Sequence, residues 1–214
     1  MLRANKKTLF ITSIVTLLPI LIGIVTWNRL PDVMATHFGM ENEPNGFSTK
    51  MFAVFGIPLF LLAMEWLAAV ITSRDPRRQN ISPKMFKLVL WIVPFVSLFC
   101  AAAIYPYNLG MNVDISFIAM MLLGLMFIVI GNYLPKARQN YTIGIRLPWT
   151  LADEENWNRT HRLGGYLWVA GGILMILMCL TGLGKASWVF GILIVLTIIP
   201  CVYSFWLYAH KKQD

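Results

Sequence analysis

Two titratable side chains in this sequence stand where they could take part in proton transfer or metal binding. Glu65 is the only acidic residue well inside a long apolar segment. An ionised carboxylate there costs about 2.5–3.5 kcal/mol, so such a residue is expected to be paired, protonated or functional. His161 follows the acidic run Asp153–Glu155, which offers it carboxylate partners for acid–base or metal chemistry. For Glu65 we expect a structural role, either as a neutral carboxyl or bonded to nearby backbone beside Trp66.

The spacing around these residues matches no catalytic or metal-binding motif. There is no HExxH pattern at His161, no GxSxG and no phosphate-binding loop. Cys100, Cys179 and Cys201 lie in apolar segments without a CxxC pair, which favours packing roles over disulfides or zinc ligands. We expect His161 at the surface, stacked among tryptophans or bonded to a loop carbonyl. The sequence therefore predicts no catalytic residue, no cofactor and no metal site.

The composition is that of an integral membrane protein. Of the 214 residues, 57% are hydrophobic and 13% are charged, and the mean hydropathy is +0.64. Six apolar runs are long enough for a helix to cross about 30 Å of hydrocarbon. They are Thr8–Trp27, Phe52–Thr72, Leu88–Tyr105, Ile115–Leu134, Gly165–Leu183 and Ser187–Tyr208. The sequence predicts an all-α protein with six transmembrane helices.

The basic residues predict how the helices are oriented. With a cytoplasmic N-terminus, fifteen of the eighteen Lys and Arg residues fall on the cytoplasmic side, and only Arg29, Lys50 and Lys185 fall outside. Both termini are therefore predicted to be cytoplasmic. The net charge of +8 is then a feature of topology, and we expect no nucleic-acid partner. Aromatic residues fit interfacial belts, with Trp27, Tyr105, Tyr107 and Trp188 outside and Tyr133, Tyr166, Trp168 and Trp206 inside.

Small residues and prolines within the spans predict how the helices pack. Gly165, Gly172 and Cys179 recur every seven residues, a spacing that lets another helix approach closely. Four prolines are expected to kink their helices or to be tolerated as in ordinary membrane helices. They are Pro19, Pro58, Pro94 and Pro200.

Two polar stretches connect the spans. In the predicted outer loop, residues 28–50, the segment Val33–Phe38 is expected to be extended and Pro44–Gly46 to form a turn. The longer stretch, Gly131–Gly165, is predicted to be cytoplasmic, with an extended or turning segment at Asn140–Arg146.

The second half of that long stretch predicts a short interfacial helix that starts after Pro148. Thr150 and Asp153 fit a capping box, and Glu155 can pair with Arg159 at i, i+4 spacing. Trp149 and Trp157 are expected at headgroup level, and the pair Gly164-Gly165 is expected to join this helix to the fifth span. We expect Arg146 to fold back toward the helix ends or the acids at 153–155.

These motifs carry a resemblance to a known family. The string NYTIGIRLPWTL at Asn140–Leu151, followed by WNRTHRLGG at Trp157–Gly165, resembles the signature of the SdpI family, and GNYLPK at Gly131–Lys136 fits the same pattern. The outer loop is similar to a short domain of unknown function that often precedes it. That likeness rests on LPD at Leu30–Asp32, THFG at Thr36–Gly39 and PNGFS at Pro44–Ser48.

The resemblance implies a multi-pass protein of a bacterial plasma membrane that protects its cell against a secreted antimicrobial peptide. In such a protein a cytoplasmic transcriptional repressor is a further possible partner. The family-like positions are Asn140, Gly144, Ile145, Arg146, Pro148, Trp149, Thr150, Trp157, Thr160, His161 and Gly165. With Glu65 they are the candidate functional residues, and His37, Phe38, Asn45 and Phe47 are the candidates for binding the peptide outside.

The expected organisation is a two-helix unit at residues 1–72, with the extracellular loop 28–50, and a four-helix SdpI-like unit at residues 73–214, with the cytoplasmic loop 135–164. Two other functions stay open at this point. A membrane enzyme acting on peptides or lipids would need a nucleophile or metal cluster, and the sequence offers only isolated candidates. A small transporter would need a polar pathway, and the spans contain one carboxyl.

Overall fold

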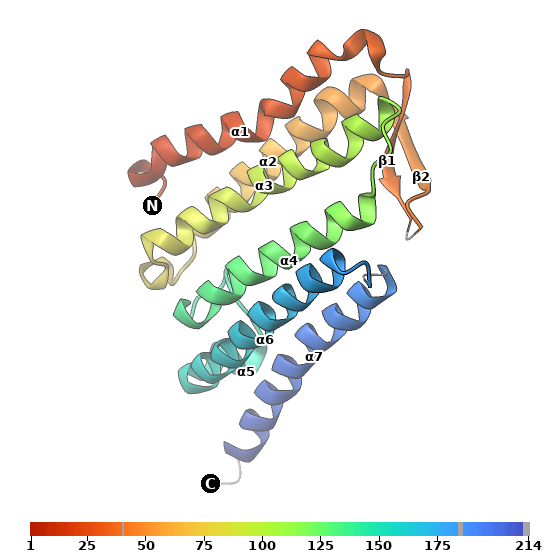
Figure 1. The fold of residues 1–214 in the computed structure, drawn as a ribbon. Helices are drawn as coiled ribbons and strands as arrows, with labels where there is room; N and C mark the ends of the chain where they lie inside the picture. Colours follow the sequence, from red (N-terminus) through yellow and green to blue (C-terminus); the bar gives the residue numbers. More distant parts are fainter. Residues whose placement is uncertain (40, 184–185, 212–214) are drawn as a thin grey trace. The chain divides into compact units, whose positions relative to one another are not determined.

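The computed structural model describes residues 1–39, 41–183 and 186–211, with the side chains of residues 186 and 187 left out. Among these residues, six helices are long and apolar enough to cross a membrane. They are α1 (Lys6–Val25), α2 (Ile57–Ser73), α3 (Pro83–Asn108), α4 (Ile115–Tyr133), α6 (Glu154–Leu180) and α7 (Ala186–Lys211) (Figure 1). The predicted all-α membrane protein with six spans is confirmed. A π-helical segment, Phe52–Gly56, precedes α2, and the two-stranded hairpin of β1 (Val33–Phe38) and β2 (Pro44–Thr49) is the one β element described.

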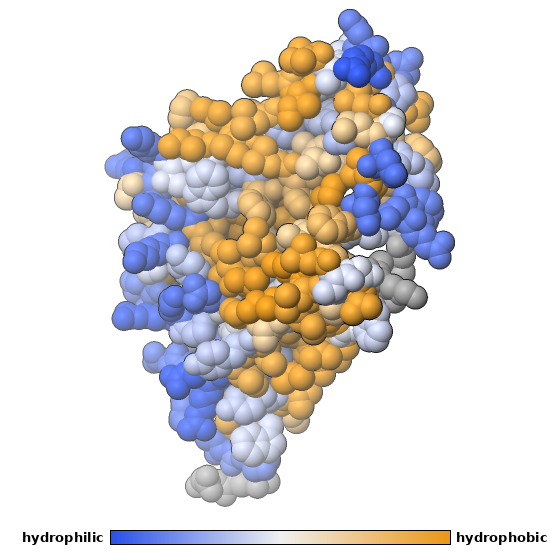
Figure 2. Space-filling view, in the orientation of Figure 1, coloured by the Kyte–Doolittle hydropathy of each residue, from blue (hydrophilic) through white to orange (hydrophobic). Residues whose placement is uncertain are grey.

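Packing divides the chain into two compact units. The first contains residues Met1–Ser73 and Phe86–Ile118, and the second contains Arg74–Met85 and Ala119–Asp214. Most of α3 therefore packs with α1 and α2, whereas the predicted organisation placed the third span with the last three. In both units, apolar side chains cover the middle of the helices and polar ones cluster near the ends (Figure 2), as expected for helices surrounded by lipid. Which ends face the cytoplasm stays a prediction, and two of the counted lysines, Lys185 and Lys212, lie outside the described residues.

The first unit has a core at the hairpin end of its helices. Leu30 and Met34 from the hairpin region pack there against Val54, Ala101, Ile104 and Tyr105. The Tyr105 hydroxyl donates a hydrogen bond to the carbonyl of Pro19 (2.9 Å), and a Cβ on Gly23 would lie 2.8 Å from the same hydroxyl. The Tyr105 ring is buried and its hydroxyl binds backbone at the proline of α1, so its place at the outer interface stays a prediction.

The hairpin differs from the prediction at its turn. β1 has the predicted bounds Val33–Phe38 and pairs antiparallel with β2, with Ala35 opposite Phe47. The predicted turn at Pro44–Gly46 is wrong, since these residues begin β2. Between the two strands, Asn42 has a φ of 66° and the Gly39 N–H donates to the Glu43 carbonyl (2.8 Å). Pro44 is compatible with the start of a strand because it opposes Phe38 at the end of the ladder.

In the second unit, α4 and α6 approach closely through glycines. A Cβ on Gly172 would overlap the carbonyl oxygen of Gly124, and one on Gly165 would lie 2.8 Å from that of Gly131. The close approach predicted at Gly165 and Gly172 is therefore confirmed. The matching pair Gly124 and Gly131, also seven residues apart, supplies the facing surface on α4.

The prediction of a separate interfacial helix between Pro148 and the fifth span is wrong. A short helix, α5 (Pro148–Ala152), precedes Asp153, and α6 then runs from Glu154 to Leu180 without a break at Gly164-Gly165. The glycine pair does not break α6, because both residues are buried against Leu134, Pro135 and Ile145 of the preceding loop, where a larger side chain would not fit. The predicted capping box also fails. Asp153 is itself the N-cap of α6, and its carboxylate accepts a hydrogen bond from the Glu155 N–H (3.0 Å).

Candidate functional site

The family-like residues gather in the second unit, where residues 134–153 fold over the first turns of α6. Trp157 is the anchor of this loop. Its side chain is 0% exposed, and its indole Nε1–H donates a hydrogen bond to the carbonyl of Ala137 (2.7 Å). The ring is enclosed between the loop and its own helix, and its expected position at headgroup level stays a prediction.

His161 lies one turn further along α6 and holds the loop by its ring. The imidazole is 0% exposed and stacks on the Trp157 ring, with centroids 3.9 Å apart. Its Nε2 accepts a hydrogen bond from the Ile145 N–H (2.9 Å), and Nδ1 lies 2.7 Å from the Trp157 carbonyl. Because a backbone N–H can only donate, Nε2 must be unprotonated and the proton must sit on Nδ1, which makes the ring neutral. The expected stacking is confirmed, and the expected surface position is wrong.

Gly144 is required at its position for two reasons. Its φ of 119° lies in the region that L side chains rarely adopt. A Cβ built on it would also overlap Nε2 of His161 and would lie 3.1 Å from the Trp157 ring. The glycine therefore lets the loop backbone lie directly on the stacked rings, so that the next N–H reaches His161.

Asn140 forms the tight turn that precedes this contact. Its side chain is buried, and Oδ1 accepts from the N–H groups of Thr142 (2.9 Å) and Ile143 (2.7 Å). Its Nδ2 donates to the carbonyls of Arg138 (2.8 Å) and Ile143 (3.1 Å). The Asn140 amide thus satisfies four polar groups of the loop without help from water, which fixes the backbone before Gly144.

Asp75 supports the loop from another segment, and the sequence analysis missed it. This buried carboxylate accepts hydrogen bonds from the Tyr141 N–H (2.9 Å), the Thr142 hydroxyl (2.8 Å) and the Arg77 N–H (2.7 Å). These three donors satisfy the buried carboxylate, as a buried polar group requires. The available signal was a lone acid, followed by proline, in an otherwise basic loop between the second and third spans.

Gln139 is a second residue that the sequence analysis missed. Its side-chain Nε2 donates to the carbonyls of Thr150 (2.8 Å) and Leu151 (3.0 Å), which ties α5 to the loop. Its own carbonyl accepts from Asn80 Nδ2 (2.7 Å), and its Oε1 accepts from the guanidinium of Arg77. Residues 74–85 and 134–153 thus form one hydrogen-bonded structure.

Thr150, Pro148 and Trp149 belong to the short helix α5. The buried Thr150 hydroxyl accepts from the Leu147 N–H (2.8 Å) and lies 2.9 Å from the Ile145 carbonyl, so it closes the turn before Pro148. Trp149 packs on α7, with its ring 5.4 Å from that of Phe205 and stacked on Tyr208 at 5.9 Å. Its buried Nε1 has no hydrogen-bond partner among the described residues.

Thr160 faces the opposite side of α6, toward α7. Its hydroxyl donates to Oδ1 of Asn156 (3.0 Å), which also accepts from the Ser204 hydroxyl (2.7 Å). Asn156 Nδ2 donates to the Ser204 carbonyl (2.9 Å). All three side chains are buried, so this hydrogen-bond network fixes the register of α6 against α7.

Arg146 is exposed, unlike most of the motif. Its guanidinium donates to the carbonyl of Tyr141 (2.7 Å), so it folds back onto the loop. The predicted pairing with the acids at 153–155 is wrong for Asp153 and Glu155, whose carboxylates pair with Lys211 and Arg159 instead. Arg146 and the exposed Pro148 are the motif positions that a molecule binding to this loop would meet first.

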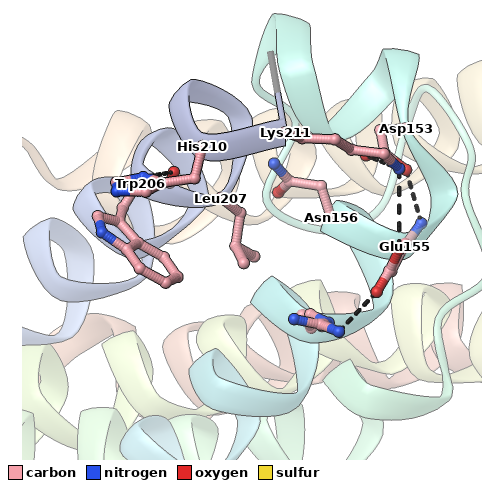
Figure 3. Close-up of a pocket in the computed structure, with 8 residues that line it drawn as sticks. Asp153, Glu155, Asn156, Trp206, Leu207, His210 and Lys211 are labelled. Atoms are coloured by element: carbon pink, nitrogen blue, oxygen red, sulfur yellow. Dashed lines mark hydrogen bonds and ion pairs between the residues drawn. The ribbon is translucent and has the colours of Figure 1, made fainter. Parts of the chain in front are cut away.

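A polar cleft of about 430 Å³ opens between the start of α6 and the end of α7 (Figure 3). The predicted Glu155–Arg159 pair is present at 2.6 Å, and Lys211 Nζ lies 2.9 Å from Asp153 and 3.7 Å from Glu155. The hydrogen bond from Lys211 holds the pKa of Asp153 below its usual value. Trp206 and His210 line the cleft, their rings 4.4 Å apart. Among the described residues, no group of three or more His, Cys, Asp or Glu side chains is placed to hold a metal ion.

Glu65 belongs to the first unit and is far along the chain from this loop. Its carboxyl group is 1% exposed, and its two oxygens lie 2.5 Å from the Thr12 hydroxyl and 2.7 Å from the Thr16 hydroxyl, both on α1. The Thr16 carbonyl in turn accepts from Ser97 of α3 (2.7 Å). The expected backbone partner beside Trp66 is not the one found. The threonine pair at i, i+4 spacing in an apolar helix was the missed signal.

The four hairpin candidates divide into two kinds. Phe38 packs edge-on against the ring of Tyr107 (4.8 Å) and helps to hold the hairpin on α3. His37 and Asn45 are exposed and lie side by side, with His37 Nδ1 2.5 Å from Asn45 Oδ1. Phe47 is 60% exposed on β2. The hairpin therefore presents polar and apolar side chains on one open surface.

Comparisons with known proteins support the resemblance found in the sequence. Residues 136–204 match the model of the SdpI/YfhL protein family, and residues 14–62 match a domain of unknown function, DUF1648. The chain is 28% identical over 204 residues to the immunity protein SdpI of Bacillus subtilis (strain 168), which covers 93% of this chain and 92% of that protein. No solved structure matches the chain. The predicted resemblance to the SdpI family is confirmed over residues 136–204, and the protein is a multi-pass bacterial membrane protein.

Proposed function

From the SdpI family motif at residues 136–204 and a relative that matches nearly the whole chain, we propose that this membrane protein makes its own cell immune to a secreted antimicrobial peptide. The observation that carries the proposal is the length of the match: the similarity to an immunity protein covers 93% of the chain. The similarity therefore extends over both units, the one that carries the hairpin and the one that carries the loop at 134–153.

The proposed mechanism is binding rather than catalysis. The family-like side chains of the loop are engaged in holding it together: His161 is stacked and hydrogen-bonded through both nitrogens, and Asn140 satisfies four backbone groups. Glu65, the other titratable candidate, is enclosed by hydroxyls of α1. An enzyme would present such groups to a substrate, whereas these residues are arranged to give the chain one stable conformation.

Peptide challenge of a sensitive bacterium tests the proposal. Cells that express the protein should tolerate a higher concentration of at least one secreted antimicrobial peptide than cells with an empty vector. The loop geometry predicts that the Gly144→Ala variant is defective. The matched control is Gly182→Ala, at another positive-φ glycine, where an added Cβ would meet no atom of the described residues within 4 Å. Unchanged killing across a broad panel of such peptides, with the protein present in the membrane, would contradict immunity.

A docking role for the loop is the second proposal. On the predicted cytoplasmic side, Arg146 and Tyr141 are exposed on a loop whose backbone is fixed from within, which suits the recognition of a protein partner such as a transcriptional repressor. Copurification of the repressor with wild-type protein, and its loss with Arg146→Ala but not with Arg162→Ala, is the expected result. Equal recovery with both variants would count against this surface.

A further inference from the structure

The free edge of the hairpin is the feature of the first unit that the proposed function leaves unused. β1 has no open edge at its centre, because the side-chain amide of Asn108 binds it there. Asn108 Oδ1 accepts from the Ala35 N–H (2.9 Å), and its Nδ2 donates to the Ala35 carbonyl (2.9 Å). One asparagine at the end of α3 thus occupies both backbone groups of Ala35 as a neighbouring strand would.

The register then shows that β2 is open. Since Ala35 directs its backbone groups toward Asn108, the pair Ala35–Phe47 is not a hydrogen-bonded pair of the ladder. The bond from the Lys50 N–H to the Asp32 carbonyl (2.9 Å) fits the same alternation, in which every second pair is bonded. The N–H and C=O of Phe47 therefore point away from β1, toward the outer edge of β2.

Side chains beside this edge form an apolar surface. Phe47 is 60% exposed, and Val33, on the neighbouring strand, is 62% exposed. Between the two strands, the hydrogen-bonded pair His37 and Asn45 continues the exposed surface toward the turn. An added strand would find backbone partners at the edge and an apolar contact at Phe47, which together are the usual requirements for strand addition.

Charge indicates what kind of segment would add there. The chain as a whole is basic, yet the hairpin turn is acidic. Lys50 is paired with Asp32 (3.0 Å), whereas Glu41 and Glu43 are exposed and Asp114 is held beside the turn by Asn42 (3.0 Å). Arg29 is the other basic residue in this part of the unit. The turn end of the β2 edge therefore favours a basic partner over an acidic one.

Resting on the immunity function proposed above, we propose that an extended, basic segment of the secreted peptide adds as a third strand to the edge of β2 at Phe47. Its backbone hydrogen-bonds to the N–H and C=O of Phe47, its apolar side chains contact the Phe47 ring, and its basic residues lie toward Glu41 and Glu43. The affinity then depends on the backbone of the peptide, and the selectivity depends on its charge and on alternate side chains.

Backbone amide exchange of the full-length protein in lipid nanodiscs tests the edge before any peptide is added. Ser48 is the internal reference, since its pair with Met34 is a bonded pair of the ladder. The Phe47 amide is expected to exchange about tenfold faster than that of Ser48, or faster still. Slow exchange at Phe47 in the peptide-free protein overturns the proposal, because the edge would then be closed already, by lipid or by a second copy of the chain.

The peptide found in the challenge assay supplies the second test. Two synthetic copies are made, methylated on alternate backbone nitrogens in the two possible registers, and their binding to the wild-type protein is measured. Because only every second N–H of an added strand faces β2, one copy should bind about tenfold more weakly and the other nearly as well as the parent peptide. Equal binding of the two copies overturns strand addition.

Variants of Phe47 give the same test in cells. Phe47→Pro removes an edge N–H without removing a ladder bond to β1 and should abolish protection, whereas Phe47→Val keeps the N–H and should retain most of it. If Phe47→Pro does not reach the membrane, the methylated peptides decide on unaltered protein. If the wild-type protein neither protects against nor binds any peptide, both the immunity function and the peptide strand proposed at the edge of β2 are overturned. Protection with two equally bound methylated copies overturns the edge alone.

Discussion

The loop at 134–153 and the hairpin at 33–49 use polar groups in opposite ways. In the loop, buried side chains of Asn140, Asp75 and His161 satisfy backbone groups from within. In the hairpin, Asn108 closes one edge and leaves the other edge, at Phe47, directed outward. A segment whose hydrogen bonds are complete within itself keeps its shape, and a segment with an unfilled edge can accept another chain. The difference indicates a structural role for the loop interior and agrees with the binding role that we propose for the hairpin.

Gly144→Ala should have the largest effect, and it should break the loop alone. The substitution combines an unfavourable positive φ with a Cβ that overlaps His161 Nε2, so the free energy of unfolding should fall by about 3 kcal/mol. Unfolding in mixed detergent micelles measures the loss. Gly182→Ala shares the positive φ but meets no atom of the described residues within 4 Å, and it should cost only about 1 kcal/mol. Equal losses in the two variants would show that the stacked rings do not confine this backbone.

Asp75→Ala should have the second largest effect and lower the free energy of unfolding by about 2 kcal/mol. It leaves the Tyr141 N–H, the Thr142 hydroxyl and the Arg77 N–H without their acceptor. Amide exchange should accelerate at Tyr141 in the loop and remain unchanged at Ser48 in the hairpin. Glu154→Ala, at an exposed acid, is the control and should change neither stability nor exchange. An Asp75→Ala protein as stable as wild type would remove this carboxylate from the account of the loop.

These two positions show what the sequence could and could not predict. Six spans follow from hydropathy alone, and the close approach of α4 and α6 follows from glycine spacing, because both depend on local composition. The motif predicted which residues matter in the loop, but not that His161 and Trp157 are buried. Trp157 and His161 are buried because the loop folds back onto α6, where Ala137 and Ile145 hydrogen-bond to them. Asp75 supports the same loop from a segment more than sixty residues earlier in the chain. The pattern of residue types within one segment cannot predict contacts between segments that lie far apart in the sequence.

The errors at helix ends have a similar origin. Local propensity alone predicts a cap at Thr150 and a break at the pair Gly164-Gly165. In the structure Asp153 caps α6 directly, and the glycines remain helical because they are buried where a larger side chain would collide. Tertiary packing therefore decided both boundaries.

Asn108→Ala tests the hairpin side of the comparison. It removes the two hydrogen bonds to Ala35 and frees the second edge, so the free energy of unfolding should fall by about 1–2 kcal/mol. The Ala35 amide should become fast to exchange, as we expect for Phe47 in the wild-type protein, while exchange in the loop should stay unchanged. Asn108→Asp keeps one acceptor and should be intermediate. A protected Ala35 amide in the alanine variant would mean that another group closes this edge.

Asp153→Ala tests the outer rim of the loop region, where polar groups are exposed. Loss of the N-cap of α6 should cost about 1 kcal/mol at neutral pH. The pKa of Asp153 is lowered in the folded protein, so its contribution is fully present above the unfolded-state pKa and is lost as the pH falls through the folded one. The difference between wild type and variant should therefore shrink on acidification to about pH 3. A difference that is constant from neutral to acidic pH would contradict this.

Arg159→Ala should have the smallest effect. Its partner Glu155 lies at i, i+4 spacing, and both side chains are more than half exposed, so water screens the pair and the loss should be about 0.3–0.5 kcal/mol. High salt should remove even that difference, whereas it should leave the cost of Gly144→Ala unchanged, since the latter is steric. If Arg159→Ala were as damaging as Asp75→Ala, the cleft between α6 and α7 would be part of the rigid loop structure rather than its solvated edge. The contrast between buried and exposed polar groups would then have to be drawn at α7 instead.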